Sequence, residues 1–449
     1  MSETIIFKQA SLVNEGKVYE SDLMLKAGRI ERIDASISAP DNAKIVDASG
    51  MFLLPGVIDD QVHFREPGLT HKGDIYTESR AAIAGGVTSF MDMPNTRPPT
   101  LNDAELMNKL SIAKRNAAAN YAFYFGASND NIEDIRNIDT TICCGVKVFM
   151  GSSTGNMLVD DDDTLAAIFR DAPLPIATHC ESTPMIEANL RDALDRYGAE
   201  IPVTEHPRIR SEEACYASTL KAVTLAREND AQLHVLHLST ARELDLFETG
   251  PVGGKRITAE TCIHFLHFTD ADYEAYGNRI KCNPSVKTAQ DRDALLAALE
   301  SGRLDIIATD HAPHTLEEKA LTDYRKAPSG LPLVQDTLLA ALELVEDGKM
   351  SLKTLVRTMC HNPARRFQVR ERGFLREGYH ADLVLVDPAA TTEVTAKRVL
   401  SKCAWSPFEG RTFRHRIVST WLNGVLAFDG DKVIEHGAAQ ALEFDRLVP

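Results

Sequence analysis

The sequence is poor in cysteine and contains no long apolar run. Eight cysteines among 449 residues are too few for a disulfide scaffold, and no Cys-x-x-Cys pair occurs, so we expect a reducing compartment, the cytoplasm. No stretch of about 18 apolar residues is present, and the first residues are polar where a signal peptide needs an apolar core. These absences argue against a membrane-bound or secreted protein.

Basic residues are scarce relative to acidic ones. The 49 lysines and arginines face 65 aspartates and glutamates, which gives a formal net charge of -16. Because binding to a phosphate backbone needs basic surfaces, we do not expect nucleic acid as a partner. A small-molecule substrate is expected instead. The oligomeric state stays open, with a homodimer as one alternative.

The two ends of the chain differ from its middle. Residues 1–52 and 366–449 consist of short alternating segments separated by glycine turns, which is typical of β-strands. We expect these ends to form one small β-sandwich domain. Residues 53–365 would form a second domain between them.

Eight compact apolar runs alternate with helical segments in this middle region. They lie at 57–63, 87–93, 121–127, 142–149, 174–180, 232–238, 256–262 and 304–310. Such near-continuous runs indicate a parallel sheet covered on both faces. The predicted fold class is therefore α/β, a (β/α)8 barrel of the TIM type. The alternative is an open doubly wound sheet, which normally carries a glycine-rich dinucleotide turn that this sequence lacks.

Polar residues stand at or near the ends of these runs. They are His63, Asn95, Lys147, His179, His237 and Asp310. The carboxyl ends of barrel strands meet at one face, so we expect these side chains to converge there. Imidazole and carboxylate groups together suit Zn²⁺ or a similar divalent ion. A lone histidine is more often structural, but three at strand ends beside Asp310 favour a metal site.

Lys147 lies in an apolar run, where a charged ammonium would be desolvated. A lowered pKa makes such an amine nucleophilic, and it can then take up CO₂ as a carbamate that bridges two cations. A Schiff-base lysine is the alternative, but it leaves the nearby histidines unexplained.

Residues 55–100 resemble the amidohydrolase superfamily and, within it, the dihydroorotases. The matching stretch is PGVIDDQVHFREPGLTHKGDIYTESRAAIAGGVTSFMDMPNTRPPT, against the family pattern Asp-x-His-x-His-x-Arg-x-Pro-Gly followed by Met-Pro-Asn-Thr. Further matches are KVFMGSSTGNM (147–157), HCE (179–181), HLST (237–240), KCNPSVK (281–287), ATDHAPH (308–314) and HNPARRF (361–367). This ordered set spans the whole predicted barrel.

The resemblance implies a zinc-dependent hydrolase with one or two ions. Its implied metal ligands are His63, an N6-carboxylated Lys147, His179, His237 and Asp310. Two cations that share a water lower its pKa and polarise an amide carbonyl. Asp310 would also be the general base, which passes the proton to the departing ring nitrogen.

One position departs from the family pattern. The first histidine of His-x-His is Gln61 here, and an amide oxygen is a weaker ligand than imidazole. We therefore expect one ion bound firmly through His179 and His237, and a loosely held ion beside Gln61. Strand alternation predicts that Asp60 points away from Gln61, and that His234 faces away from His237 in a structural or supporting role.

The substrate prediction rests on Arg65. In the resemblance Arg65, Asn95 and His314 grip a substrate carboxylate, while Asn283 and the backbone near Gly330 hold a pyrimidine ring. An arginine fork suits a carboxylate. This predicts reversible hydrolysis of dihydroorotate to N-carbamoyl-aspartate, in pyrimidine biosynthesis.

Two alternatives have a different chemistry. Allantoinases and the dihydropyrimidinases or hydantoinases act on cyclic amides without a carboxylate, and a third reading is a non-catalytic scaffold. The charged segment 315–330 after the eighth run is either a lid over the substrate or an ordinary loop.

Overall fold

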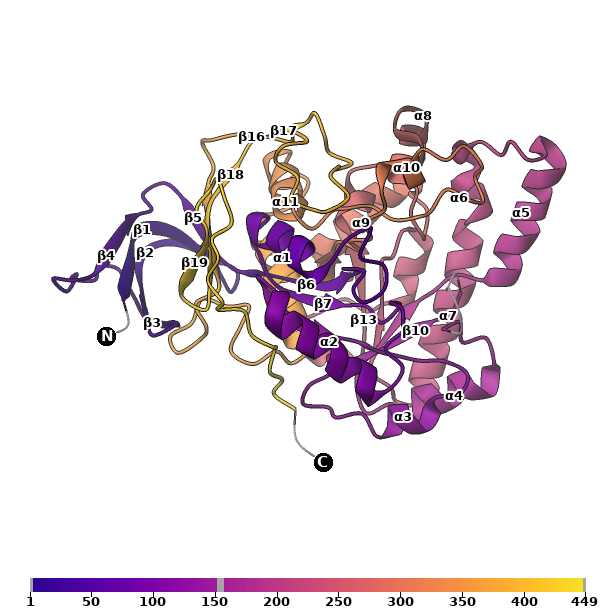
Figure 1. Ribbon diagram of the computed structural model, residues 1–449, viewed down its shortest axis with the longest axis horizontal. Helices are drawn as coiled ribbons and strands as arrows, with labels where there is room; N and C mark the ends of the chain where they lie inside the picture. The colour runs from indigo at the N-terminus through magenta and orange to yellow at the C-terminus, as the bar shows by residue number, and fades with distance from the viewer. Residues whose placement is uncertain (1–2, 152–156, 447–449) are drawn as a thin grey trace.

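The structure, a computed structural model, describes residues 3–151 and 157–446. Figure 1 shows a barrel of strands and helices beside a separate sheet at the end of the molecule that carries the N-terminus. The predicted fold class, a (β/α)8 barrel with a small β-sandwich built from both termini, is confirmed. Residues 152–156, in the middle of the segment 147–157, lie outside the described residues.

Eight parallel strand positions form the barrel, and they fall within the predicted apolar runs or overlap them. The strands are β6 (Val57–Val62), β7 (Val87–Asp92), β8 (Asn120–Phe123) with its short continuation β9 (Phe125–Gly126), β10 (Val146–Phe149), β11 (Ile176–His179), β12 (Leu233–Val235), β13 (Ile257–Cys262) and β14 (Ile306–Ala308). The ring closes after β14, where Val62 and His311 form a parallel bridge. The His63 N–H donates to the His311 carbonyl over 2.7 Å.

Almost every residue of these strands is buried, because helices cover the outside and side chains fill the inside. One interior cluster gathers apolar side chains from strands around the ring, including Ile58, Tyr124, Leu236 and Ile306, and Phe367 packs among them. The barrel centre is therefore a packed core.

The barrel strands are connected by helices, several of which begin at a polar cap. The α-helices are α1 (Ile75–Ala84), α2 (Asp103–Asn116), α3 (Ile132–Arg136), α4 (Asp162–Asp171), α5 (Thr183–Tyr197), α6 (His206–Ile209), α7 (Glu212–Glu228), α8 (Tyr273–Tyr276), α9 (Ala289–Ser301), α10 (Leu316–Lys319), α11 (Thr337–Glu346), α12 (Leu352–Val356) and α13 (Asn362–Arg366). Asp74 caps α1 and Thr288 caps α9, each in a reciprocal capping box.

Strands from both ends of the chain pair in one eight-stranded sheet. They are β1 (Thr4–Asn14), β2 (Lys17–Lys26), β3 (Arg29–Asp34), β4 (Lys44–Asp47), β5 (Phe52–Pro55), β15 (Leu383–Asp387), β18 (Arg416–Leu422) and β19 (Val425–Phe428). The order is β19-β18-β15-β5-β1-β2-β3, with β4 pairing β1. The pair β5 and β15 joins the two ends, and β5 leads directly into the first barrel strand.

Other parts of the C-terminal segment lie against the barrel. The short pair β16 (Thr392–Glu393) and β17 (Thr412–Phe413) stands apart from the large sheet. The Trp405 indole N–H donates to the His314 carbonyl over 2.7 Å, and Ala441 bridges Tyr121 of β8. The division at residues 52 and 366 stays a prediction.

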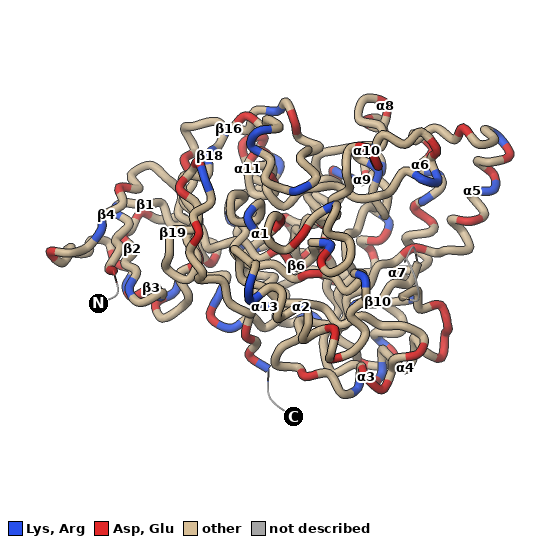
Figure 2. Tube along the Cα trace, in the orientation of Figure 1, with Lys and Arg blue, Asp and Glu red and all other residues tan. Residues whose placement is uncertain are grey.

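Charged residues of both signs are interspersed over the surface. Figure 2 shows acidic and basic positions alternating along the outer helices, α5 and the α3–α4 region among them. In the ranges 3–151 and 157–446, no helix is both long enough and apolar enough to cross a bilayer.

Candidate active site

A polar cavity of about 490 Å³ opens beyond the carboxyl ends of the barrel strands. It is lined by all eleven residues that the sequence predicted for the site: Gln61, His63, Arg65, Asn95, Lys147, His179, His237, Asn283, Asp310, His314 and Gly330. The lining also includes Leu69, Lys72, Thr96, Arg97, Pro99, Phe149, Met157, Ala312, Pro328 and Ser329. The fold thus brings the predicted residues together, and their chemical roles remain proposals.

Three of these residues have an unusual backbone conformation. Arg65, His237 and Asp310 have φ angles of 69°, 43° and 49°, in the left-handed region that non-glycine residues rarely adopt. Each comes just after a barrel strand ends, where the chain turns away from the sheet. Strained conformations of this kind cluster at functional sites because the surrounding structure holds them there.

Two imidazole rings of the cavity lining lie next to each other. His179 Nδ1 lies 3.0 Å from His237 Nε2, and His179 Nε2 lies 3.0 Å from the Glu181 carboxylate. Because that carboxylate only accepts, Nε2 carries the proton and the lone pair of Nδ1 points toward His237. Burial lowers the pKa of both histidines below the ordinary value, which keeps the rings neutral near pH 7.

The Glu181 carboxylate is itself held by Arg210. Burial raises the pKa of Glu181, but the charge of Arg210 and the hydrogen bond from His179 outweigh it and bring the pKa to about 2. An ionised carboxylate thus fixes the orientation of His179. Sequence reasoning noted the segment HCE but gave Glu181 and Arg210 no role, since nothing in that segment indicates where the carboxylate points.

A second group of polar side chains surrounds Asp310. His63 Nε2 lies 3.1 Å from Asp310 Oδ1, and His63 Nδ1 lies 2.7 Å from Asn95 Oδ1. Gln61 donates its amide N–H to the same Asp310 oxygen over 3.2 Å. Burial raises the pKa of Asp310, but hydrogen bonding to His63 outweighs it, so the pKa lies below its ordinary value.

Gln61 therefore turns its donor toward Asp310. Its carbonyl oxygen lies 3.8 Å from the Cys262 sulfur. This orientation is the reverse of what a metal-binding amide oxygen would require.

Lys147 lies in β10, buried beside the ring of Phe149, whose centroid is 4.5 Å from Nζ. Burial lowers the pKa of Lys147 to about 7, against the opposing charge of Asp310. A large fraction of the amine is then neutral near pH 7, as carbamate formation requires.

The ligand atoms of these side chains decide whether a divalent cation fits the cavity. At His179 and His237, two neutral imidazoles share one space beside a deprotonatable Lys147, which fits such an ion. At His63 and Asp310 the ligand types also fit, but Gln61 offers a hydrogen-bond donor in place of a third ligand.

Basic side chains gather around His314 in another part of the cavity lining. Lys72 Nζ lies 3.0 Å from His314 Nδ1, and His314 Nε2 lies 3.0 Å from the Ser329 carbonyl. A lysine only donates, so Nδ1 accepts and Nε2 donates. The Arg65 Nη2 atom lies 3.2 Å from His314 Nε2. Because that ring nitrogen carries a hydrogen, it cannot accept from Arg65, and the Nη2 hydrogens are left for another acceptor. Sequence reasoning did not identify Lys72.

Segment 315–330 forms one wall of the cavity and is tied to the barrel. Lys319 Nζ donates to the carbonyls of Lys281, Pro328 and Gly330, each within 3.1 Å. Lys281 Nζ donates to two further carbonyls of the segment over 2.6 Å each. The Gly330 N–H already donates to Lys281, whereas the Asn283 Oδ1 atom is buried without a partner among the described residues.

Strand alternation misplaced the side chains of Asp60 and His234, while the structural or supporting role given to His234 stays a prediction. The Asp60 carboxylate lies 3.3 Å from His234 Nε2, although β6 and β12 are not neighbours in the ring, so both side chains point into the barrel. The pairing of β6 shifts register between Asp59 and Val62, and His237 has a positive φ. Both irregularities interrupt the two-residue period.

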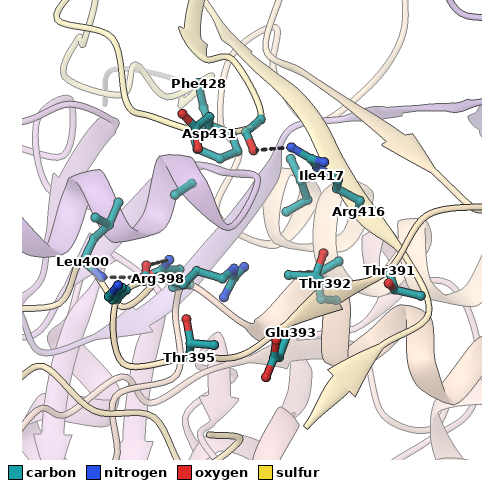
Figure 3. Close-up of a pocket in the computed structure, with 15 residues that line it drawn as sticks. Thr391, Thr392, Glu393, Thr395, Arg398, Leu400, Arg416, Ile417, Phe428 and Asp431 are labelled. Carbon is teal, nitrogen blue, oxygen red and sulfur yellow. Dashed lines mark hydrogen bonds between the residues drawn. The ribbon is translucent and has the colours of Figure 1, made fainter. Parts of the chain in front are cut away.

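A second cavity, of about 400 Å³, lies where the barrel meets the sheet (Figure 3). Figure 3 labels Arg398, Leu400 and Arg416 in its wall. The Leu400 N–H donates to the Gln335 side-chain oxygen, the Gln335 amide donates to the Arg398 carbonyl, and the Arg416 guanidinium donates to the Gly430 carbonyl. Among the described residues that line it there is no histidine or cysteine. It therefore lacks the metal-binding character of the first cavity.

Comparisons with known proteins agree with this geometry. The amidohydrolase family model matches residues 52–427. The chain belongs to the amidohydrolase family. This amidohydrolase is 34% identical to the dihydroorotase of Halobacterium salinarum, over 92% of this chain and 96% of the relative. It is 32% identical to the allantoinase of Solibacter usitatus, over 98% and 97% of the two chains.

Among solved structures it resembles the L-hydantoinase (dihydropyrimidinase) of Arthrobacter aurescens. The TM-score is 0.93 at 28% identity, over 99% of this chain and all of the other. The predicted family is thus confirmed, and this amidohydrolase is an enzyme that acts on a small molecule. The three relatives differ in substrate, so their names leave the substrate open.

Proposed function

We propose that this amidohydrolase is a dihydroorotase, which reversibly hydrolyses the cyclic amide of (S)-dihydroorotate to N-carbamoyl-L-aspartate. The observation that carries the proposal is the charge of the cavity. Its formally charged lining consists of Arg65, Lys72, Arg97, Lys147 and Asp310. Lys147 is largely neutral near pH 7 and becomes an anion once carboxylated, and Lys72 is paired with Glu318. Arg65 and Arg97 still bring two guanidinium charges to the lining beside Asp310, which favours an anionic ligand.

Arg65 would bind the substrate carboxylate. Its guanidinium is buried, its Nε donates to the Pro313 carbonyl over 3.2 Å, and its Nη2 is left for a ligand. Charge-assisted hydrogen bonds from a planar fork are among the strongest contacts that a carboxylate makes. Dihydroorotate offers this group, whereas allantoin and hydantoin do not.

The remaining roles follow from the positions of the polar residues in the cavity lining. The buried Asn283 Oδ1 would accept a ring N–H, and Asn95 and His314 would flank the carboxylate. A substrate contact at Gly330 would be made by its carbonyl oxygen, because its N–H already donates to the Lys281 carbonyl. Asp310 would take a proton from water and return it to the departing ring nitrogen.

Zn²⁺ is the proposed cofactor, held by His179, His237 and an N6-carboxylated Lys147, with His63 and Asp310 beside it. When bound, the metal would activate water and polarise the amide carbonyl. Since Gln61 offers a donor to Asp310, we propose that one ion is held firmly and that a second is held weakly.

Substrate competition tests the proposal. We expect a higher kcat/KM for dihydroorotate than for allantoin, hydantoin or dihydrouracil. Arg65→Met should lower kcat/KM for dihydroorotate on the order of 10- to 100-fold, the equivalent of about 1.5–3 kcal/mol for a charged hydrogen bond. The same variant should leave turnover of a neutral cyclic amide nearly unchanged.

Arg115→Met, at an exposed arginine on α2, is the matched control for loss of a guanidinium. Faster turnover of a neutral cyclic amide by the wild type would favour allantoinase or dihydropyrimidinase activity. The sequence identity to the allantoinase relative is about the same as that to the dihydroorotases, and this supports allantoinase activity as the second candidate function. If the protein turned over none of the four cyclic amides, a non-catalytic scaffold would be favoured.

A further inference from the structure

A second cluster of metal-ligand side chains lies inside the barrel, outside the cavity lining. Asp60 of β6, His234 of β12 and Glu260 of β13 are all fully buried. His234 Nε2 lies 3.3 Å from Asp60 Oδ2 and 3.2 Å from Glu260 Oε2, and one potential ligand atom from each residue lies within 4.8 Å of the others. We call these three residues the inner cluster.

A hydrogen bond fixes which nitrogen of His234 faces the carboxylates. Nδ1 lies 2.8 Å from the Thr258 hydroxyl, which itself donates to the Leu233 carbonyl over 3.3 Å. The hydroxyl hydrogen is thus used, so Thr258 accepts and Nδ1 carries the proton in the neutral ring. The lone pair of Nε2 then points at two carboxylate oxygens. Supporting bonds of this kind orient metal-binding histidines.

The Asp60 carboxylate lacks the hydrogen bonds that burial demands. Neither oxygen of Asp60 has a hydrogen-bond partner among the described residues, although the side chain is fully buried. Glu260 Oε1 accepts the His237 N–H over 3.2 Å, and its other oxygen faces His234. Buried acidic groups are normally paired or bound to a metal, and the ion-pair contact that Asp60 and Glu260 share among the described residues is the His234 ring.

We propose that Asp60, His234 and Glu260 bind a divalent transition-metal ion such as Zn²⁺. In a tetrahedral site with bonds of about 2.0–2.1 Å, ligand atoms stand about 3.3 Å apart, close to the two separations found here. The second oxygen of Asp60 or a water completes the site. The ion neutralises both carboxylates and joins β6 to β12 and β13 below the cavity.

This site is separate from the catalytic ions and does not rest on the proposed function. None of its three ligands lines the cavity. Its link to the cavity is the Glu260 carboxylate, which holds the backbone of His237. A closed site with side-chain ligands from three strands has a structural role.

Metal counting in a variant that lacks the two imidazoles of the firmly held cavity ion tests the proposal. The double variant His179→Ala, His237→Ala, purified with ZnCl₂ and then desalted, should retain about one zinc per chain by ICP-MS. Adding Asp60→Asn should remove it. Adding Asp59→Asn should not, because the neighbouring buried Asp59 bonds to Thr309 and stays outside the cluster. Zinc that is absent from the double variant, or that survives Asp60→Asn, overturns the proposal.

Anomalous diffraction from wild-type crystals at the zinc edge decides the matter if a variant does not fold. The expected result is a peak about 2.0–2.2 Å from His234 Nε2 and from an Asp60 oxygen. Density for the side chains of the inner cluster without such a peak overturns the proposal.

Discussion

Gln61 and Asp310 show how one side-chain type changes the chemistry of a metal site. An imidazole at position 61 would offer a lone pair, whereas the glutamine amide donates an N–H to Asp310 over 3.2 Å. That hydrogen bond uses one lone pair of the carboxylate that we propose as base and ligand. Gln61 would therefore position Asp310 and not bind the ion.

Gln61→His should raise the tightly bound zinc by about one equivalent per chain relative to the wild type, because imidazole replaces a hydrogen-bond donor with a metal ligand. ICP-MS after desalting measures the difference. Gln335→His, at the wall of the second cavity, is a control that should leave the count unchanged. Equal zinc in Gln61→His and wild type would show that the glutamine does not weaken the site.

Glu181→Gln should weaken zinc binding in the cavity by about 10- to 100-fold, the usual effect of removing a carboxylate that supports a metal-binding histidine. The neutral amide accepts the His179 N–H more weakly than a carboxylate does, and it leaves Arg210 without its counter-charge. Competition with a chromophoric chelator gives the affinity. Glu205→Gln, at a buried glutamate outside the cavity that pairs with Arg208, should keep wild-type affinity.

At the scale of elements, segment 315–330 is built as a wall. Three hydrogen bonds join the segment to Lys281, two from Lys281 Nζ to segment carbonyls and one from Lys319 Nζ to the Lys281 carbonyl. Two more from Lys319 close the segment on its own Pro328 and Gly330 carbonyls. Sequence reasoning left a lid and a loop open, because charge alone does not tell which carbonyls a lysine reaches. The bonds favour a fixed wall over a segment that opens freely.

Lys319→Met should lower the free energy of unfolding by about 2–3 kcal/mol, since three buried carbonyls lose a charged donor. It should also speed proteolytic cleavage within 320–328. Denaturant unfolding and limited trypsin digestion measure the two effects. Lys326→Met, at an exposed lysine of the same segment, should change the stability little. A Lys319 variant as stable and resistant as the control would contradict the wall.

At the scale of the whole molecule, His361 joins the sheet to the barrel. Its Nε2 accepts the Glu15 N–H over 2.9 Å, and its Nδ1–H donates to the Gly373 carbonyl over 2.6 Å. The bond from Glu15 requires the neutral ring, because a protonated Nε2 has no lone pair to accept it. Burial lowers its pKa from 6.5 to about 4.

The protein should lose stability as the pH falls from 6.5 toward 4. Above pH 6.5 the His361 ring is neutral in both the folded and the unfolded protein. Between pH 6.5 and 4 the ring is protonated in the unfolded chain but stays neutral in the folded one. The free energy of unfolding should fall more steeply with acid than in His361→Gln, by up to about 1.4 kcal/mol per pH unit. Urea unfolding at several pH values measures the slope. His71→Gln, at an exposed histidine, should keep the wild-type slope.

The sequence predicted the barrel and its polar face because both depend on periodic patterns. Buried parallel strands are continuously apolar, so polar residues at their ends, such as His179 and Asp310, stand out. Asp60 and His234 were misplaced because a register shift and a positive φ interrupt the strand period. Glu181 and Lys72 were missed because their roles depend on partners far away in the sequence, Arg210 and His314.

The pairing of β5 with β15 also sets an order of events during synthesis. β5 emerges from the ribosome before the barrel, but its partner β15 emerges only after nearly all of the barrel has been made. Until then one edge of β5 presents unpaired backbone groups, the kind of edge that other chains can join. The nascent chain therefore passes through a long interval in which its first strands are open to aggregation, and removing the last strands would make that interval permanent.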